Sequence, residues 1–174
     1  MSEQNNIPLT RFESMLKTNN VYFFDSSEFE DIIHYYLNNG KIALAKKATK
    51  LGLEQHPTST NLKLFQVEMF IFENELEVAE QLLENIYLLE QFNEEVFIQK
   101  ANILSRRDKH LEAIKMLEKA HDLSTESSDV LSLIGMEYLF LEDFENAKKY
   151  FIQCLFEDSE DFSALYNIIY CFEY

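Results

Sequence analysis

Four alanines recur along the chain at a constant interval. Ala45, Ala79, Ala113 and Ala147 are each 34 residues apart, and a regular interval of roughly 20 to 50 residues is the signature of stacked structural repeats. A period of this length accommodates two short helices joined by a turn. The spacing therefore predicts a chain built from helical hairpins.

Composition supports helices over strands. Of the 174 residues, 47% are apolar, which is enough for a continuous core. Only three glycines and two prolines are present, too few turn residues for a protein of many strands. We therefore expect an all-α fold.

Counted with this period, four complete units and part of a fifth cover residues 26 to 174. The units are 26–59, 60–93, 94–127, 128–161 and the partial unit 162–174. The fourth is the clearest copy, with Leu131, Ile134, Gly135, Tyr138, Ala147 and Phe151 in frame. Each hairpin carries apolar residues on both broad sides, so it must stack on its neighbours to bury them. The small residue at position 135, a glycine, is expected to let two neighbouring helices meet.

These residues resemble the tetratricopeptide-repeat (TPR) family from about residue 26 onward. The resemblance implies a right-handed α-solenoid of helix-turn-helix TPR units that acts as a non-catalytic protein-protein interaction module. The second unit departs most from the family pattern, with Gln66 and Val67 where Leu and Gly are typical, and the chain contains no Trp.

The first 25 residues lie outside the repeats. Residues 1–8 are predicted to be a loose tail, and Leu9, Phe12, Met15 and Leu16 then mark one face of a short helix. The run Val21 to Phe24 is predicted to be an extended plug against the first repeat. Ser27 and Glu30 fit a capping box at the start of the first repeat helix.

The last residues continue the repeat frame. Leu165, Ile169 and Phe172 fall where the fourth unit has Leu131, Gly135 and Tyr138. A terminal helix of a solenoid normally has a polar outer face, so we expect further repeats or another domain after Tyr174. The alternative is that residues 162–174 form a capping helix.

The charge of the chain excludes several partners. A formal net charge of −16 disfavours nucleic acid and anionic membrane surfaces, which bind Lys and Arg. No secretion signal and no apolar run of about 18 residues is present. The two cysteines have no disulfide or metal spacing and fit a reducing compartment. A cytoplasmic location is expected.

The resemblance also implies where a partner binds, since the first helix of each TPR unit lines a concave groove. The groove residues expected to contact a partner are Glu30, His34, Leu64, Glu68, Ile71, Glu95, Ile98, Asn102, Asp129, Met136, Tyr166 and Tyr170. No Lys or Arg stands at the groove positions, which disfavours the acidic C-terminal tail of a chaperone, because a carboxylate ligand needs cationic contacts. A basic or apolar peptide or protein segment is predicted instead. The alternative is that this mildly acidic face is simply solvated.

Catalysis finds no support in the sequence. The four histidines fall in different segments without a metal-binding spacing. We expect no enzyme activity, no metal and no cofactor. Two alternatives to peptide binding remain: a solenoid that self-associates into a homo-oligomer, and the N-terminal regulatory part of a larger multidomain protein.

Overall fold

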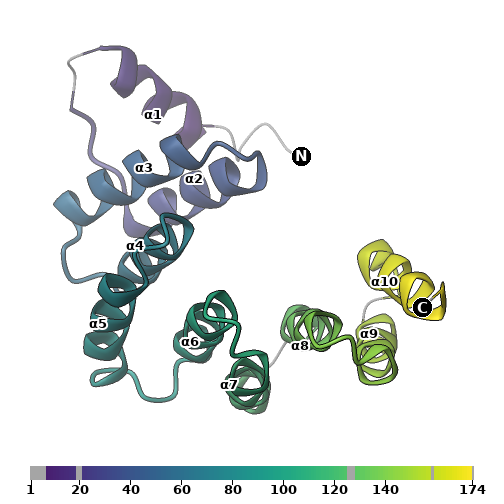
Figure 1. Cartoon of the computed structure of the whole chain (residues 1–174). Helices are drawn as coiled ribbons and strands as arrows, with labels where there is room; N and C mark the ends of the chain where they lie inside the picture. The colour runs from purple at the N-terminus through teal and green to yellow at the C-terminus, as the bar shows by residue number, and fades with distance from the viewer. Residues whose placement is uncertain (1–6, 19–20, 125–127, 158, 174) are drawn as a thin grey trace. The chain divides into compact units, whose positions relative to one another are not determined.

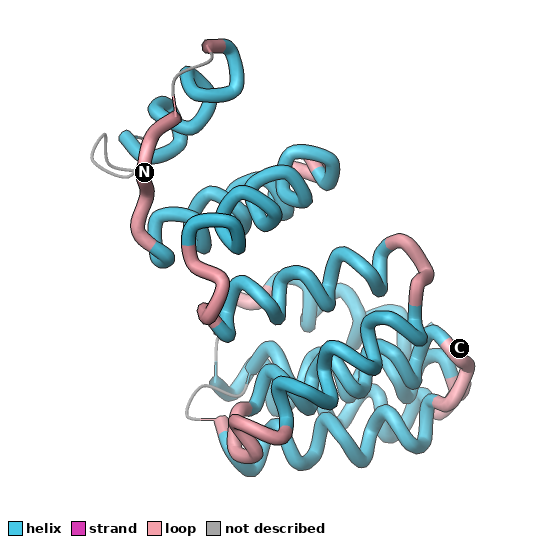
Figure 2. Tube along the Cα trace, turned by 90° about the vertical axis from the view of Figure 1, so that its left-hand side faces the viewer, coloured by secondary structure: helices cyan, strands magenta, loops and turns pink. Residues whose placement is uncertain are grey.

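The computed structural model describes residues 7–18, 21–124, 128–157 and 159–173. These residues form helices joined by turns and loops (Figure 2). The chain divides into two compact units, Met1–Glu73 and Asn74–Tyr174, and each is described by itself. The predicted domain boundary after residue 25 stays a prediction.

The first unit contains α1 (Ile7–Lys17), α2 (Ser26–Asn38), α3 (Ile42–Gln55) and α4 (Thr60–Phe72). The second contains α5 (Leu76–Tyr87), α6 (Glu94–Arg106), α7 (His110–Leu123), α8 (Ser128–Phe140), α9 (Phe144–Glu157) and α10 (Phe162–Glu173) (Figure 1). The first helices of the repeats begin at Ser26, Thr60, Glu94, Ser128 and Phe162, each 34 residues after the one before. The all-α fold of repeated helical hairpins is therefore confirmed.

The start of the chain differs from the sequence prediction in two details. Helix α1 begins at Ile7 and takes Pro8 into its first turn, where the missing N–H of proline costs no helical hydrogen bond. Helix α2 is capped by Asp25, whose backbone N–H donates to Oε2 of Glu28 at 2.9 Å. Glu30, predicted to complete the cap, instead accepts a hydrogen bond from the Ser26 hydroxyl at 3.0 Å.

The segment between α1 and α2 is held against α3 by side chains. The amide of Gln55 accepts a hydrogen bond from the Phe24 N–H and donates one to the Tyr22 carbonyl, each at 3.0 Å. Val21 and Phe23 are exposed, whereas Phe24 is fully buried. This alternation is that of extended backbone, and it places the Phe24 ring 5.9 Å from that of Phe12 in the core of this unit.

The second unit is a stack in which each helix packs on the next one along the chain, from α5 through α10. Figure 1 shows α6, α8 and α10 along one side of this unit and α7 and α9 along the other. Gly135 of α8 meets α9 so closely that an added Cβ would lie 2.7 Å from Cε1 of the fully buried Phe151. The small residue is thus required for close packing, as the sequence predicted.

The turn between the first and the second helix of each repeat has one left-handed residue at the same place. Gly40, Asn74, Asp108 and Glu142 have φ angles of 67°, 60°, 56° and 58°. Glycine adopts this region at no steric cost, and Asn and Asp tolerate it, but a glutamate is strained there. The geometry of the turn is therefore kept even where the residue disfavours it.

Candidate partner-binding surface

The first helices of the second unit carry seven of the predicted groove residues. Repeat positions 34 residues apart group them into rows across α6, α8 and α10: Glu95 with Asp129; Ile98 with Tyr166; and Asn102, Met136 and Tyr170. Asp129, Met136, Tyr166 and Tyr170 are exposed, and the three residues on α6 are half-buried. The first helices of the second unit therefore carry acidic groups in one row, an isoleucine and a tyrosine in the second, and an amide, a thioether and a tyrosine in the third.

Hydrogen bonds along α6 orient its polar residues. Nε2 of Gln99 donates to Oε1 of Glu95 at 2.7 Å, and Nδ2 of Asn102 donates to Oε1 of Gln99 at 3.3 Å. Gln99 is itself buried, so its side chain is fixed by packing. Glu95 and Asn102 are held in place before any partner arrives, which lowers the ordering cost of binding. Sequence reasoning missed Gln99, although its spacing of four from Glu95 is a helical contact distance.

The apolar part of the surface joins α8 to α10. Nδ2 of Asn167 lies 3.8 Å from the sulfur of Met136, and the ring of Tyr170 stands edge-on to Phe144 at a centroid distance of 6.3 Å. Tyr166 is the most exposed of the predicted aromatic residues. An exposed thioether and exposed tyrosine rings can each contact an apolar or aromatic side chain.

In the first unit the predicted residues are tied into local contacts. Glu30 accepts a hydrogen bond from Nδ2 of Asn61 at 3.1 Å, and His34 stands edge-on to Phe65 at 4.9 Å. Glu68 is half-buried.

Leu64 and Ile71 differ from the prediction, because their side chains are only 4% and 6% exposed. Buried side chains offer a partner no contact area, so we leave both out of the binding surface.

Among the described residues no group of three or more His, Cys, Asp or Glu is placed to hold a metal ion. Burial raises the pKa of the Cys154 thiol to about 11 and also raises that of Cys171. Both thiols are therefore protonated at neutral pH and poor nucleophiles. In the part of the chain that the structure describes, no helix is long and apolar enough to cross a bilayer.

The fold and this surface define the class of an α-helical repeat protein, and comparison with known proteins gives the repeat type. The sequence profile described as tetratricopeptide repeat matches residues 128–158, a range that includes α8 and α9. No curated protein shows significant similarity to the chain in sequence.

Solved structures share the fold. TTC0263, a thermophilic TPR protein of Thermus thermophilus, matches with a TM-score of 0.77 and 16% identity, over 95% of this chain and 89% of its own. PilF of Pseudomonas aeruginosa matches at 0.66 and 22%, over 84% and 67%. A chain of the APC/C hetero-tetramer Cut9–Hcn1 matches at 0.70 and 15%, over 85% of this chain and 30% of its own. The resemblance to TPR proteins is thus confirmed for the fold.

Proposed function

We propose that this chain is a non-catalytic interaction module that binds a basic or apolar segment of a partner protein on the first-helix surface of its second unit. The TPR fold supports a protein-protein interaction scaffold, and one of its structural neighbours is a chain of a hetero-tetramer. The observation that carries the proposal is the row arrangement. The 34-residue frame puts the acidic Glu95 and Asp129 at one repeat position of the first helices, and the exposed Met136, Tyr166 and Tyr170 at two others.

The arrangement favours a ligand with two kinds of side chain. Carboxylates at Glu95 and Asp129 attract Lys or Arg. The thioether and the two rings gain from burial against an apolar or aromatic group. A segment in which basic and apolar residues alternate would satisfy both rows.

The proposal is tested by selecting random peptides displayed on phage against the whole chain. Enrichment of sequences that combine Lys or Arg with apolar residues is expected. The double variant Glu95→Lys, Asp129→Lys should weaken the selected peptides about thirtyfold, since it turns two attractions of about 0.5 kcal/mol each into repulsions of similar size, a change of about 2 kcal/mol. The matched control is Glu118→Lys, Asp122→Lys, which makes the same charge change at exposed positions of α7.

Two results would contradict the proposal. Selected peptides that bind both double variants equally would show that the first-helix surface is not the binding site. Enrichment of acidic peptides would show that its charge does not choose the ligand. Sedimentation of the free chain tests the alternative of self-association. A dimer that dissociates on Tyr166→Asp would show that a second copy of the chain, and not a partner segment, occupies this surface.

A further inference from the structure

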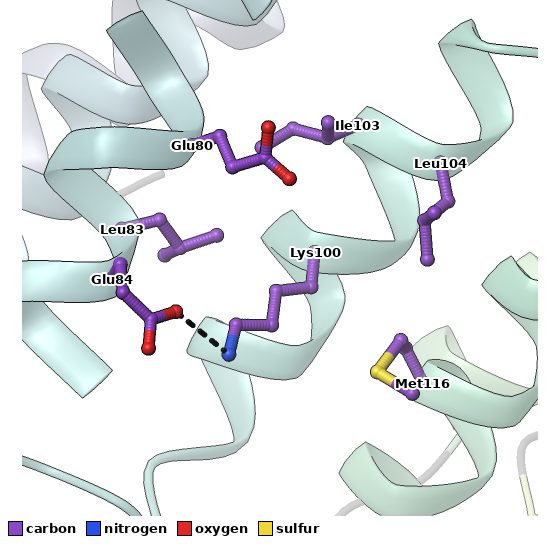
Figure 3. A pocket seen from close by; sticks show the side chains of 7 residues that line it. All are labelled: Glu80, Leu83, Glu84, Lys100, Ile103, Leu104 and Met116. Carbon is purple, nitrogen blue, oxygen red and sulfur yellow. Dashed lines mark ion pairs between the residues drawn. The ribbon is translucent and has the colours of Figure 1, made fainter. Parts of the chain in front are cut away.

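A second concave feature lies between α5, α6 and α7, away from the surface formed by α8 and α10. It is a hollow of about 230 Å³ lined by Glu80, Leu83, Glu84, Lys100, Ile103, Leu104 and Met116. Figure 3 shows Leu83 and Lys100 facing each other across it, with Leu104 and Met116 at one end. Leu83 and Ile103 are buried and form its floor. The hollow is therefore apolar inside and charged at its mouth.

The same place one repeat later is filled. The counterparts of Leu104 and Met116, 34 residues on, are Tyr138 and Tyr150, whose rings stack at a centroid distance of 5.5 Å and an interplanar angle of 18°. Burial raises the pKa of both tyrosine hydroxyls. The counterpart of the exposed Glu80 is Ile114, which is buried. The hollow thus exists where two aromatic rings and an isoleucine of the repeat are replaced by Leu, Met and Glu.

The mouth of the hollow presents negative charge to solvent. Glu77, Glu80 and Glu84 have side chains that are 81%, 59% and 57% exposed, whereas those of Lys100 and Arg107 are 29% exposed or less. Nζ of Lys100 lies 3.5 Å from Glu84 and 3.8 Å from the centroid of the Tyr87 ring, and Arg107 contacts Glu80 at 3.0 Å. The side chains of the two cations are less exposed than those of the three acids, and the acids outnumber the cations, so this group of five residues carries a net negative charge.

We propose that this hollow is a second binding site, which takes an aromatic side chain from a partner segment that carries Lys or Arg next to it. At about 230 Å³ the hollow is larger than a buried apolar cavity of about 150 Å³ that accepts benzene. The repeat itself shows that aromatic rings fit this place, and the Met116 thioether favours contact with a ring edge. The exposed acids select the adjacent positive charge.

Methyl NMR of the whole chain labelled with 13C-methyl methionine tests the proposal with defined probes. Tyramine supplies a ring and a positive charge, p-cresol the ring alone, and 4-hydroxyphenylacetate the ring with a negative charge. The Met116 methyl signal should shift saturably with tyramine in the millimolar range expected for so small a ligand. Affinity should fall about threefold or more from tyramine to p-cresol, and further to 4-hydroxyphenylacetate.

Two variants separate the hollow from the rest of the molecule. Leu104→Tyr copies the counterpart Tyr138, fills the space and keeps the Met116 reporter, so it should abolish the tyramine shift at unchanged helical content. The double variant Glu80→Gln, Glu84→Gln should leave the affinity for p-cresol unchanged and lower the affinity for tyramine to the same value. This second variant decides the question even if Leu104→Tyr does not fold.

The proposal is overturned if the Met116 methyl does not respond, if all three probes bind equally, or if Leu104→Tyr folds and still binds. A shift of the Met136 methyl alone would assign the probe to the first-helix surface instead. Because Met136 reports on that surface separately, failure of this site and failure of the proposed function are distinguishable.

Discussion

A polar pair between α7 and α8 gives a prediction whose sign depends on whether one partner or both partners are replaced. Nδ1 of His110 lies 2.8 Å from Oε2 of Glu137, and the two side chains are 15% and 10% exposed. The His110 ring also stacks on Phe140 at 5.1 Å. One repeat earlier the same two positions hold Leu76 and Ile103, both buried. The chain has thus placed a hydrogen-bonded pair where its own repeat uses aliphatic contact.

The expected magnitudes follow from burial. His110→Leu leaves the Glu137 carboxylate without its donor, and we expect a loss of about 2 kcal/mol in the free energy of unfolding, at the lower side of the range for buried pairs because a tenth of the carboxyl side chain is still exposed. Glu137→Ile leaves the His110 imidazole without its hydrogen-bond partner and should cost about 1 kcal/mol. The double variant recreates the Leu76 and Ile103 pair and should match the original chain or exceed its stability.

Urea unfolding followed by circular dichroism measures all four proteins. The predicted departure from additivity is about 3 kcal/mol, the upper end for residues in direct contact. Glu137→Gln serves as the conservative control, because its amide oxygen still accepts a hydrogen bond from His110. A double variant no more stable than His110→Leu would refute the reasoning, since it would show that the site cannot take an apolar pair.

Other substitutions test the packing, the turns and the thiols. Gly135→Ala should lower the free energy of unfolding by about 1 kcal/mol, because an overpacking cost of about 2 kcal/mol outweighs a helix-propensity gain of about 1 kcal/mol. Adding Phe151→Leu should restore the lost stability. A single variant more stable than the original chain would contradict the close contact. Glu142→Gly should raise the free energy of unfolding in urea by about 1 kcal/mol, because it relieves left-handed strain. Gly40→Ala should lower it by a similar amount, although no atom lies within 4 Å of the new Cβ. If both variants changed the free energy in the same direction, backbone strain would be excluded as the cause. With a pKa of about 11, about one part in a thousand of the Cys154 thiol should be thiolate at pH 8. Alkylation of the native chain should therefore be far slower than in urea and should become faster as the pH rises. Rapid alkylation of the native chain would contradict this prediction.

The hairpins were predictable because one signal, the 34-residue period, is carried by many residues at once. The cap of α2 was less certain in principle, because Asp25 with Glu28 and Ser27 with Glu30 have the same spacing of three residues. Both pairs satisfy the local pattern of a capping box. Tertiary packing sets the path by which the chain enters the helix, and this path decides which pair forms the cap. The spacing of the residues carries no information about that path.

The binding surface was less predictable than the fold. Leu64 and Ile71 belong to α4, which buries five residues spread around the helix, so no single stripe marks its inner and outer faces. The hollow between α5, α6 and α7 depends on the combined size of side chains from three helices. Only the comparison of Leu104 with Tyr138, one repeat apart, hints at it in the sequence.

The hairpin turns also determine where the chain tolerates changes of length. Three residues separate the two helices of every hairpin, whereas the links between hairpins contain four residues, or six at residues 88–93, where α5 is two residues shorter than α3, α7 and α9. One residue added inside a hairpin would rotate the second helix by about 100° relative to the first and carry its alanine out of the interface. The link at 88–93 is the longest of those between repeats, and we expect an inserted label or tag to be tolerated best between Glu90 and Phe92, ahead of Asn93, which caps α6.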